Sequence, residues 1–133
     1  MKIKPQSLEP ELQIEALSAG YNGKIVLRDF SLRVAAGEVA AIIGPNGCGK
    51  STLLRCATGL LKPRAGRVLL AGDDVTQLPA RARARRLALL PQHFEGGAEL
   101  SGEEMALLGR TPHLPPYGQI ARRDREIARQ ALE

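Results

Sequence analysis

The chain has 133 residues, of which 44% are hydrophobic and 25% charged, and these values fit one soluble globular domain. The net charge of +5 is compatible with nucleic acid as a partner, but aromatic residues, which stack on bases, make up only 3% of the chain. The basic residues are also spread out, so no nucleic acid is expected as a partner. No apolar run approaches the length of about 18 residues that a membrane span needs, and no signal peptide is evident, so we expect a cytosolic protein.

The first predicted elements are strands. Apolar and polar residues alternate from Leu12 to Ser18 and again from Phe30 to Val34, as in half-buried strands. Asn22-Gly23 lies between them and is typical of a turn. The short apolar run Val39–Ile43 is followed by glycines, which predicts a strand buried on both faces.

Helices and strands then alternate. Lys50–Thr58 has helical spacing, and Gly59 follows where a helix should end. Gly66–Ala71 is predicted to be a strand, and Pro79 is expected to open a helix that continues to Arg86. The apolar run Leu87–Leu90 predicts one more short strand.

The last quarter of the chain changes in character. Ser101 and Glu104 form a capping-box pattern before the apolar run Met105–Leu108. Thr111–Gly118 contains three prolines and is expected to be an irregular connector. Arg122–Glu133 predicts a helix with no stop signal, so we expect the chain to be a fragment of a longer protein.

The strongest chemical signal is a glycine-rich loop. The segment Gly44–Ser51 satisfies the pattern G-x-x-x-x-G-K-[ST] between an apolar run and a predicted helix. In such a loop the backbone N–H groups and the helix N-terminus attract phosphate oxygens, Lys50 reaches the β- and γ-phosphates, and Ser51 offers a hydroxyl to Mg²⁺. A loop that only turns a strand into a helix would leave Lys50-Ser51 without a purpose. The residues expected to bind the nucleotide here are Gly44, Asn46, Gly47, Cys48, Gly49, Lys50 and Ser51.

Around this loop the chain resembles the nucleotide-binding subunits of ABC transporters. The likeness runs from about Leu12 to His113 and includes LSAGYNGKIVLRDFSLRVAAGEVAAIIGPNGCGKSTLL, GLLKPRAGRVLLAGDDV and RRLALLPQ. The stretch MALLGRTPH further resembles the branch that serves iron-siderophore, haem and cobalamin importers. The resemblance implies an α/β fold with a partial P-loop NTPase core and an N-terminal antiparallel β-subdomain in residues 1–94. The start of a helical subdomain would follow in residues 95–133.

The resemblance also implies roles for three residues outside the P-loop pattern. Tyr21 matches the aromatic residue that stacks on adenine, although the residues alone favour a turn tyrosine beside Asn22-Gly23. Thr52 matches the residue that touches the α-phosphate, and Gln92 matches the Q-loop glutamine, which reaches Mg²⁺ and the attacking water. Lys50 and Gln92 are thus the candidate catalytic residues, and Ser51 and Gln92 the candidate magnesium ligands.

Other motifs are expected to be structural. Leu100–Glu104 looks like the family's LSGGQ signature, but it follows Gln92 too closely, which favours a helix cap. His93 and His113 are expected at the surface. A predicted helix carries a basic face that we expect to be solvated, made of Arg81, Arg83, Arg85 and Arg86.

The resemblance implies an importer ATPase whose partners are integral membrane permease subunits and a second copy of the ATPase, on the inner face of the cell membrane. After Gln92 no apolar run ends in Asp-Glu, so the 133-residue chain alone is expected to bind ATP weakly or fold poorly and to lack hydrolysis. The resemblance further implies that the strands that would cover Val39–Ile43 lie beyond Glu133, so we expect this run to form an exposed apolar edge. Three alternatives remain: a non-transporter ABC ATPase acting in DNA repair or translation, a nucleotide-binding remnant without turnover, and another P-loop class such as a small kinase.

Overall fold

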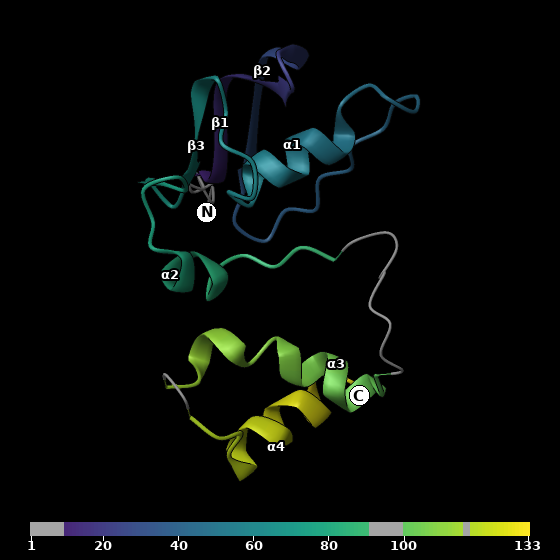
Figure 1. The fold of residues 1–133 in the computed structure, drawn as a ribbon, viewed down its shortest axis with the longest axis vertical. Helices are drawn as coiled ribbons and strands as arrows, with labels where there is room; N and C mark the ends of the chain where they lie inside the picture. Colours follow the sequence, from purple (N-terminus) through teal and green to yellow (C-terminus); the bar gives the residue numbers. More distant parts are fainter. Residues whose placement is uncertain (1–9, 91–99, 116–117) are drawn as a thin grey trace, which may run out of the picture. The chain divides into compact units, whose positions relative to one another are not determined.

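The computed structural model describes residues 10–90, 100–115 and 118–133, and the chain divides into two compact units, Met1–Pro79 and Ala80–Glu133. The first unit contains a sheet with one helix beside it, and the second contains short helices (Figure 1). Gln92 and His93 lie outside the described residues.

The first unit is built on a four-stranded antiparallel sheet in the order β2-β1-β3-β4. The strands are β1 Pro10–Tyr21, β2 Lys24–Ala35, β3 Ala65–Leu70 and β4 Asp73–Asp74. The predicted strands around Leu12–Ser18, Phe30–Val34 and Gly66–Ala71 are therefore confirmed. So is the predicted turn, because Asn22 and Gly23 both have positive φ between β1 and β2, as the commonest two-residue hairpin turn requires.

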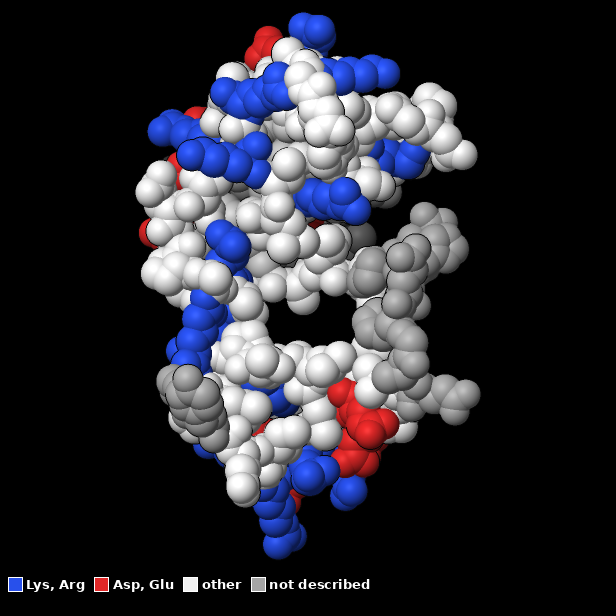
Figure 2. All heavy atoms as spheres, viewed as in Figure 1, with Lys and Arg blue, Asp and Glu red and all other residues white. Residues whose placement is uncertain are grey.

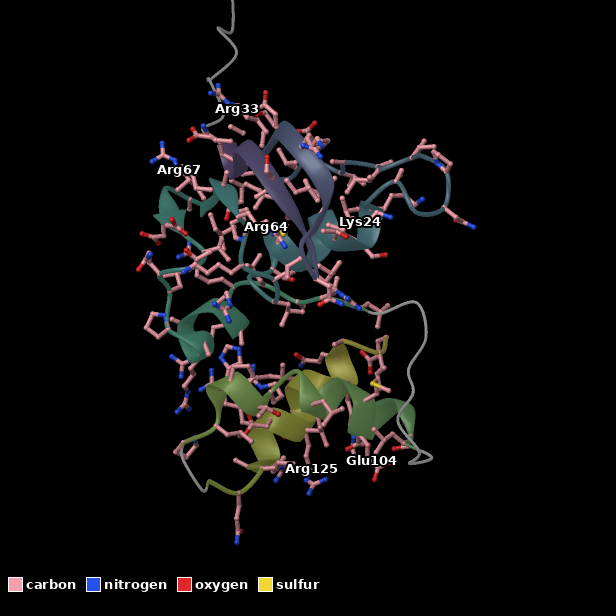
Figure 3. All side chains as sticks on the ribbon, turned by 45° about the horizontal axis from the view of Figure 1, so that its top comes forward. Lys24, Arg33, Arg64, Arg67, Glu104 and Arg125 are labelled. Carbon is pink, nitrogen blue, oxygen red and sulfur yellow. The ribbon has the colours of Figure 1, made fainter. Side chains whose placement is uncertain are left out.

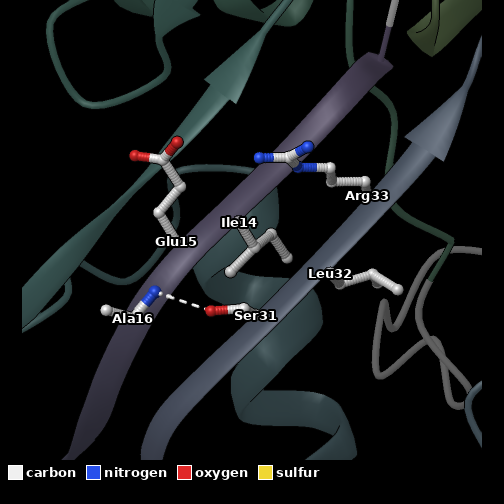
Figure 4. A pocket seen from close by; sticks show the side chains of 6 residues that line it. All are labelled: Ile14, Glu15, Ala16, Ser31, Leu32 and Arg33. Atoms are coloured by element: carbon white, nitrogen blue, oxygen red, sulfur yellow. Dashed lines mark hydrogen bonds between the residues drawn. The ribbon is translucent and has the colours of Figure 1, made fainter.

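Two irregular positions, Ala16 and Asp29, bend the β1–β2 hairpin. At each of them a serine hydroxyl of the opposite strand accepts a hydrogen bond from the backbone N–H. Ala16 has φ 46° and its N–H donates to the Ser31 hydroxyl at 3.0 Å (Figure 4). Asp29 has φ 47° and its N–H donates to the Ser18 hydroxyl at 3.1 Å. Because a bulge removes a backbone N–H from the ladder, each hydroxyl supplies the acceptor that the facing strand no longer offers. An open hollow lies over the first position, lined by Ile14, Glu15, Ala16, Ser31, Leu32 and Arg33.

Ser31→Ala is expected to lower the free energy of unfolding by about 0.5–1.5 kcal/mol, because the Ala16 N–H loses its acceptor at a partly solvated site. Urea unfolding followed by circular dichroism measures the change. Ser31→Thr keeps the hydroxyl and should keep most of the stability. Equal stability of Ser31→Ala and the unchanged protein would show that water replaces the serine without cost.

Helix α1, Lys50–Ala57, packs on the sheet and forms the core of the first unit with it. Its apolar face is buried, and the helix ends in a Schellman motif in which Leu60 N–H donates to Arg55 O at 2.8 Å and Gly59 N–H to Cys56 O at 3.0 Å. This confirms the predicted helix and its end. The buried apolar residues of the unit are Ile14, Leu17, Ala19, Leu27, Leu53, Cys56, Ala57, Val68, Leu70 and Val75.

Two predicted strands are wrong. Val39–Ile43 is not a strand, and Val39 and Ile43 are 95% and 93% exposed; the exposure expected for this run is confirmed. Leu87–Leu90 is not a strand either, and Leu90 is 89% exposed. An apolar run becomes a buried strand only when neighbouring strands pair with it, and no strand among the described residues does so for either run.

The second unit consists of α2 Ala80–Ala84, α3 Gly102–Leu108, the 3₁₀ helix η1 Thr111–His113 and α4 Arg122–Gln130. The three predicted helices are confirmed, although α2 and α4 are shorter than predicted, and η1 occupies part of the expected irregular connector. In the described parts of the chain, no helix is both long and apolar enough to cross a membrane.

Helices α3 and α4 are held together by an ion pair in a small apolar contact. Arg110 Nε donates to Asp124 Oδ1 at 3.0 Å, and both side chains are largely buried. Leu107 and Ala128 are buried beside them, at 7% and 2% exposure. Asp124 also accepts from the Ala121 N–H at the start of α4, so one carboxylate stabilises both the pair and the helix N-terminus.

The hydrogen bond from Arg110 holds the pKa of the Asp124 carboxyl below its ordinary value, because it favours the charged form. A lowered folded-state pKa gives stability above the ordinary pKa, and that stability is lost as the pH falls through the folded value. The thermal midpoint should therefore fall below about pH 4 more steeply in the unchanged protein than in Asp124→Asn. Arg110→Met should flatten the profile similarly, and a steep profile in both variants would contradict this assignment.

Candidate nucleotide-binding site

The glycine-rich loop leads directly into α1, so the helix N-terminus faces whatever the loop holds (Figure 1). Gly49 is the N-cap, with φ 102° and ψ 8°, and no side chain caps the helix. The first turn contains no acidic residue. Unpaired N–H groups and the positive end of the helix dipole are thus left without a negative side chain, which is the arrangement that attracts an anion.

The Lys50 side chain folds back over this loop. Its ammonium donates to the carbonyl oxygens of Gly44 and Pro45, both at 2.7 Å, and lies 3.9 Å from the Cys48 sulfur. These contacts hold the ammonium against the loop. Lys50 forms no ion pair with the acidic side chains among the described residues, so its charge is held at the loop without a competing carboxylate.

Close packing explains two of the loop glycines. A Cβ on Gly44 would lie 2.8 Å from the Cys48 sulfur. A Cβ on Gly49 would lie 2.7 Å from Leu27 Cδ2, and the positive φ of Gly49 would strain any other residue. The loop is therefore shaped by its own cysteine and by β2, and not only by the needs of a ligand.

The two hydroxyl residues that follow Lys50 differ in exposure. Ser51 is exposed in the first turn of α1, whereas Thr52 is 5% exposed. A single free hydroxyl at this place suits Mg²⁺, which keeps several waters and takes most of its other ligands from substrate phosphates. Thr52 packs inside the unit, so its side chain anchors the start of the helix.

Tyr21 lies at the end of β1 and is 38% exposed. Its hydroxyl accepts a hydrogen bond from Arg55 Nη1 of α1 at 3.2 Å. The structure thus brings Tyr21 into the same unit as the loop and α1, whereas Gln92 lies outside the described residues. The sequence reasoning missed Arg55; its one signal is a position four residues after Ser51, on the same face of the helix.

The remaining motifs are structural. Ser101 accepts from the Glu104 N–H, and Glu104 accepts from the Ser101 N–H at 2.8 Å, which confirms the predicted helix cap. The pKa of Glu104 is lowered by hydrogen bonds from Ser101. Arg81 and Arg85 are exposed, but each donates through Nε to the Pro112 carbonyl at 2.9 Å, so the basic face also fastens α2 to η1.

The described geometry agrees with the comparisons with known proteins. The family described as "ABC transporter" matches residues 27–133. The iron(3+)-hydroxamate import ATP-binding protein FhuC of Bacillus subtilis (strain 168) is 34% identical over 122 residues, which is 92% of this chain and 45% of that protein. The hemin import ATP-binding protein HmuV of Pseudomonas entomophila (strain L48) is 43% identical over 121 residues, which is 91% of this chain and 46% of that protein.

A solved structure of an ATP-binding subunit of an ABC transporter superposes with a TM-score of 0.66 at 34% identity. The match covers 80% of this chain and 44% of the other. The α/β class and the partial P-loop core predicted from the sequence are confirmed by this likeness. The chain spans less than half the length of both relatives.

Proposed function

Because the chain belongs to the ABC transporter family, we propose that it is the ATP-binding part of an importer for an iron-siderophore, haem or cobalamin type of substrate. The observation that carries the proposal is the ammonium of Lys50, held inside a loop at an uncapped helix N-terminus. The printed functions of the relatives support the importer branch, since those proteins import iron(3+)-hydroxamate and hemin.

The triphosphate of ATP would bind at the loop formed by Gly44–Lys50. The loop N–H groups and the N-terminus of α1 would attract phosphate oxygens, and Lys50 would exchange one of its carbonyl contacts for the β- and γ-phosphates. Lys and Arg side chains dominate the charged groups on the visible face of the first unit (Figure 2). This positive field favours the approach of an anionic nucleotide.

The base and the metal would be bound by residues on either side of the phosphates. Tyr21 would offer an aromatic face to adenine, which contributes about 1–3 kcal/mol when a base stacks. Ser51 and Gln92 would hold Mg²⁺, which neutralises phosphate charge when bound. Because its side chain is buried, Thr52 would contact the α-phosphate through its backbone N–H in the first turn of α1, and Asn46, Gly47, Cys48 and Gly49 would supply loop backbone.

Hydrolysis and transport belong to the whole assembly. We place Lys50 and Gln92 in the catalytic machinery, with a second ATPase subunit and integral membrane permease subunits as partners at the inner face of the cell membrane. Residues 1–94 would form the β-subdomain and P-loop core, and residues 95–133 the start of the helical subdomain. The 133 residues contain no apolar run followed by Asp-Glu after Gln92, so they alone would bind ATP without rapid turnover.

Isothermal titration of the full chain with Mg-ATP tests the nucleotide binding on which the proposal depends. Saturable binding of ATP, competed by tripolyphosphate and weaker for AMP, is expected, because the loop recognises the β- and γ-phosphates. Absence of ATP binding would overturn the proposal.

The importer function is tested in cells. Loss of the chain should abolish uptake of an iron-siderophore, haem or cobalamin. Unchanged uptake together with a DNA-repair or translation defect would favour a non-transporter ATPase.

A further inference from the structure

The hairpin tip that carries Tyr21 is fastened to the helix that follows the phosphate loop. Arg55 of α1 donates to the Tyr21 hydroxyl at 3.2 Å. Arg64, which follows α1, donates to the Gly23 carbonyl at 3.4 Å through its side chain and to the Ser18 carbonyl at 2.8 Å through its backbone N–H. Figure 3 labels Arg64 and Lys24, the first residue of β2 after this tip.

The two arginines act on different parts of the tip. Arg64 contacts backbone atoms, whose course is already set by the tight Asn22-Gly23 turn between the paired residues Tyr21 and Lys24. Arg55 instead donates its hydrogen bond to the end of the Tyr21 side chain. The hydrogen bond from Arg55 therefore restrains the direction in which the Tyr21 side chain extends, while the turn sets only where that side chain begins.

The contact also sets the ring at a defined place relative to the loop. Arg55 follows Ser51 by one helical turn, which is about 6 Å along the axis. The Tyr21 hydroxyl is thus held by the last turn of α1, the helix that the glycine-rich loop begins.

We propose that Arg55 is a positioning residue for the nucleotide base: it holds the Tyr21 ring in the orientation that meets adenine when the triphosphate occupies the loop. This inference rests on the proposed ATP-binding function. It makes Arg55 important for the base and not for the phosphates. If Arg55 acted only through its charge, its loss would weaken the binding of ATP and of tripolyphosphate alike, because a nearby positive charge attracts any polyphosphate.

The test compares ATP with inorganic tripolyphosphate, which carries no base. Dissociation constants of the full chain are measured by isothermal titration for Arg55→Met, Tyr21→Phe and the double variant. Both single variants should weaken ATP binding about 3-fold to 10-fold, as expected for one hydrogen bond. The double variant should be no weaker than either, and tripolyphosphate binding should stay within about 2-fold, because the two changes break the same contact.

Arg64→Met is the matched control, since it removes an equal charge near the same tip without touching the Tyr21 hydroxyl. It should bind ATP within about 2-fold of the unchanged chain. Equal losses for ATP and tripolyphosphate in Arg55→Met, or additive losses in the double variant, would overturn the inference. Unchanged ATP affinity in Arg55→Met would also overturn it while leaving the proposed function intact, whereas a chain that binds no ATP overturns that function first. Circular dichroism of Tyr21→Phe, which removes a single hydroxyl, checks that this variant is folded.

Discussion

Replacing Lys50 by methionine is expected to weaken ATP binding by about 10-fold to 100-fold, because charge-assisted hydrogen bonds contribute about 1.5–3 kcal/mol. In the described structure the ammonium is already held by the Gly44 and Pro45 carbonyls at 2.7 Å. It therefore needs no large rearrangement to meet a phosphate. Methionine has a similar length but cannot donate, so the variant removes the charge and keeps most of the apolar stem. Titration with Mg-ATP and with tripolyphosphate measures the loss, which should be similar for both ligands.

Lys62→Met provides the control for the loss of a positive charge. Lys62 follows the C-terminal end of α1, whereas Lys50 begins the helix. The control should bind ATP within about 2-fold of the unchanged protein, because exposed charges beyond a Debye length are largely screened. Wild-type affinity in Lys50→Met would instead support the view that the glycine loop only joins the preceding segment to the helix.

The sheet and its hairpin could be predicted because their information is local. Alternating residues in Leu12–Ser18 and Phe30–Val34 bury one face of each strand, and Asn22-Gly23 selects the turn. The bulges at Ala16 and Asp29 could not be predicted, since each depends on a serine of the opposite strand. The register between two strands depends on both strands, so the sequence of either strand alone does not determine it.

The predicted strands Val39–Ile43 and Leu87–Leu90 failed for a related reason. Both are short apolar runs, and hydrophobicity alone cannot say whether partners are present to pair with them. The described residues supply no strand that does, and a backbone without a partner gains nothing from the extended conformation. The ends of helices were also placed less well, because propensity changes little over the residues where α2 and α4 stop.

The residues of the candidate site also differ in whether a local motif predicts them. The loop residues follow from one contiguous motif, so the sequence alone predicts the roles of Lys50 and Ser51. Tyr21 entered only through the resemblance, and its contact with Arg55 joins residues far apart in the chain. No periodicity or motif predicts such a contact. The roles given to Lys50, Ser51, Tyr21, Thr52 and Gln92 remain predictions, and the binding experiments address those of Lys50 and Tyr21.

Gly49→Ala is expected to lower the free energy of unfolding by about 2–6 kcal/mol and to impair ATP binding as well. Two separate costs contribute. A residue with a Cβ at φ 102° is strained by about 1–3 kcal/mol, and the new methyl group would lie 2.7 Å from Leu27 Cδ2 in a packed region, which adds about 1–3 kcal/mol. Denaturant unfolding followed by circular dichroism measures the stability, and titration measures the binding.

The two costs can be separated within the chain itself. Gly47 has φ 82°, and a methyl group added there would meet no atom within 4 Å, so Gly47→Ala should carry the backbone strain alone and destabilise less than Gly49→Ala. Leu27→Ala opens space beside Gly49, so Gly49→Ala should cost less in that background than in the unchanged protein, by an amount equal to the relieved overlap. Equal costs in both backgrounds would show that Leu27 moves aside freely and that strain alone requires glycine. In either case a requirement for glycine at the N-cap would come from this unit itself, through the backbone conformation alone or together with Leu27 of β2, and would hold before any nucleotide binds.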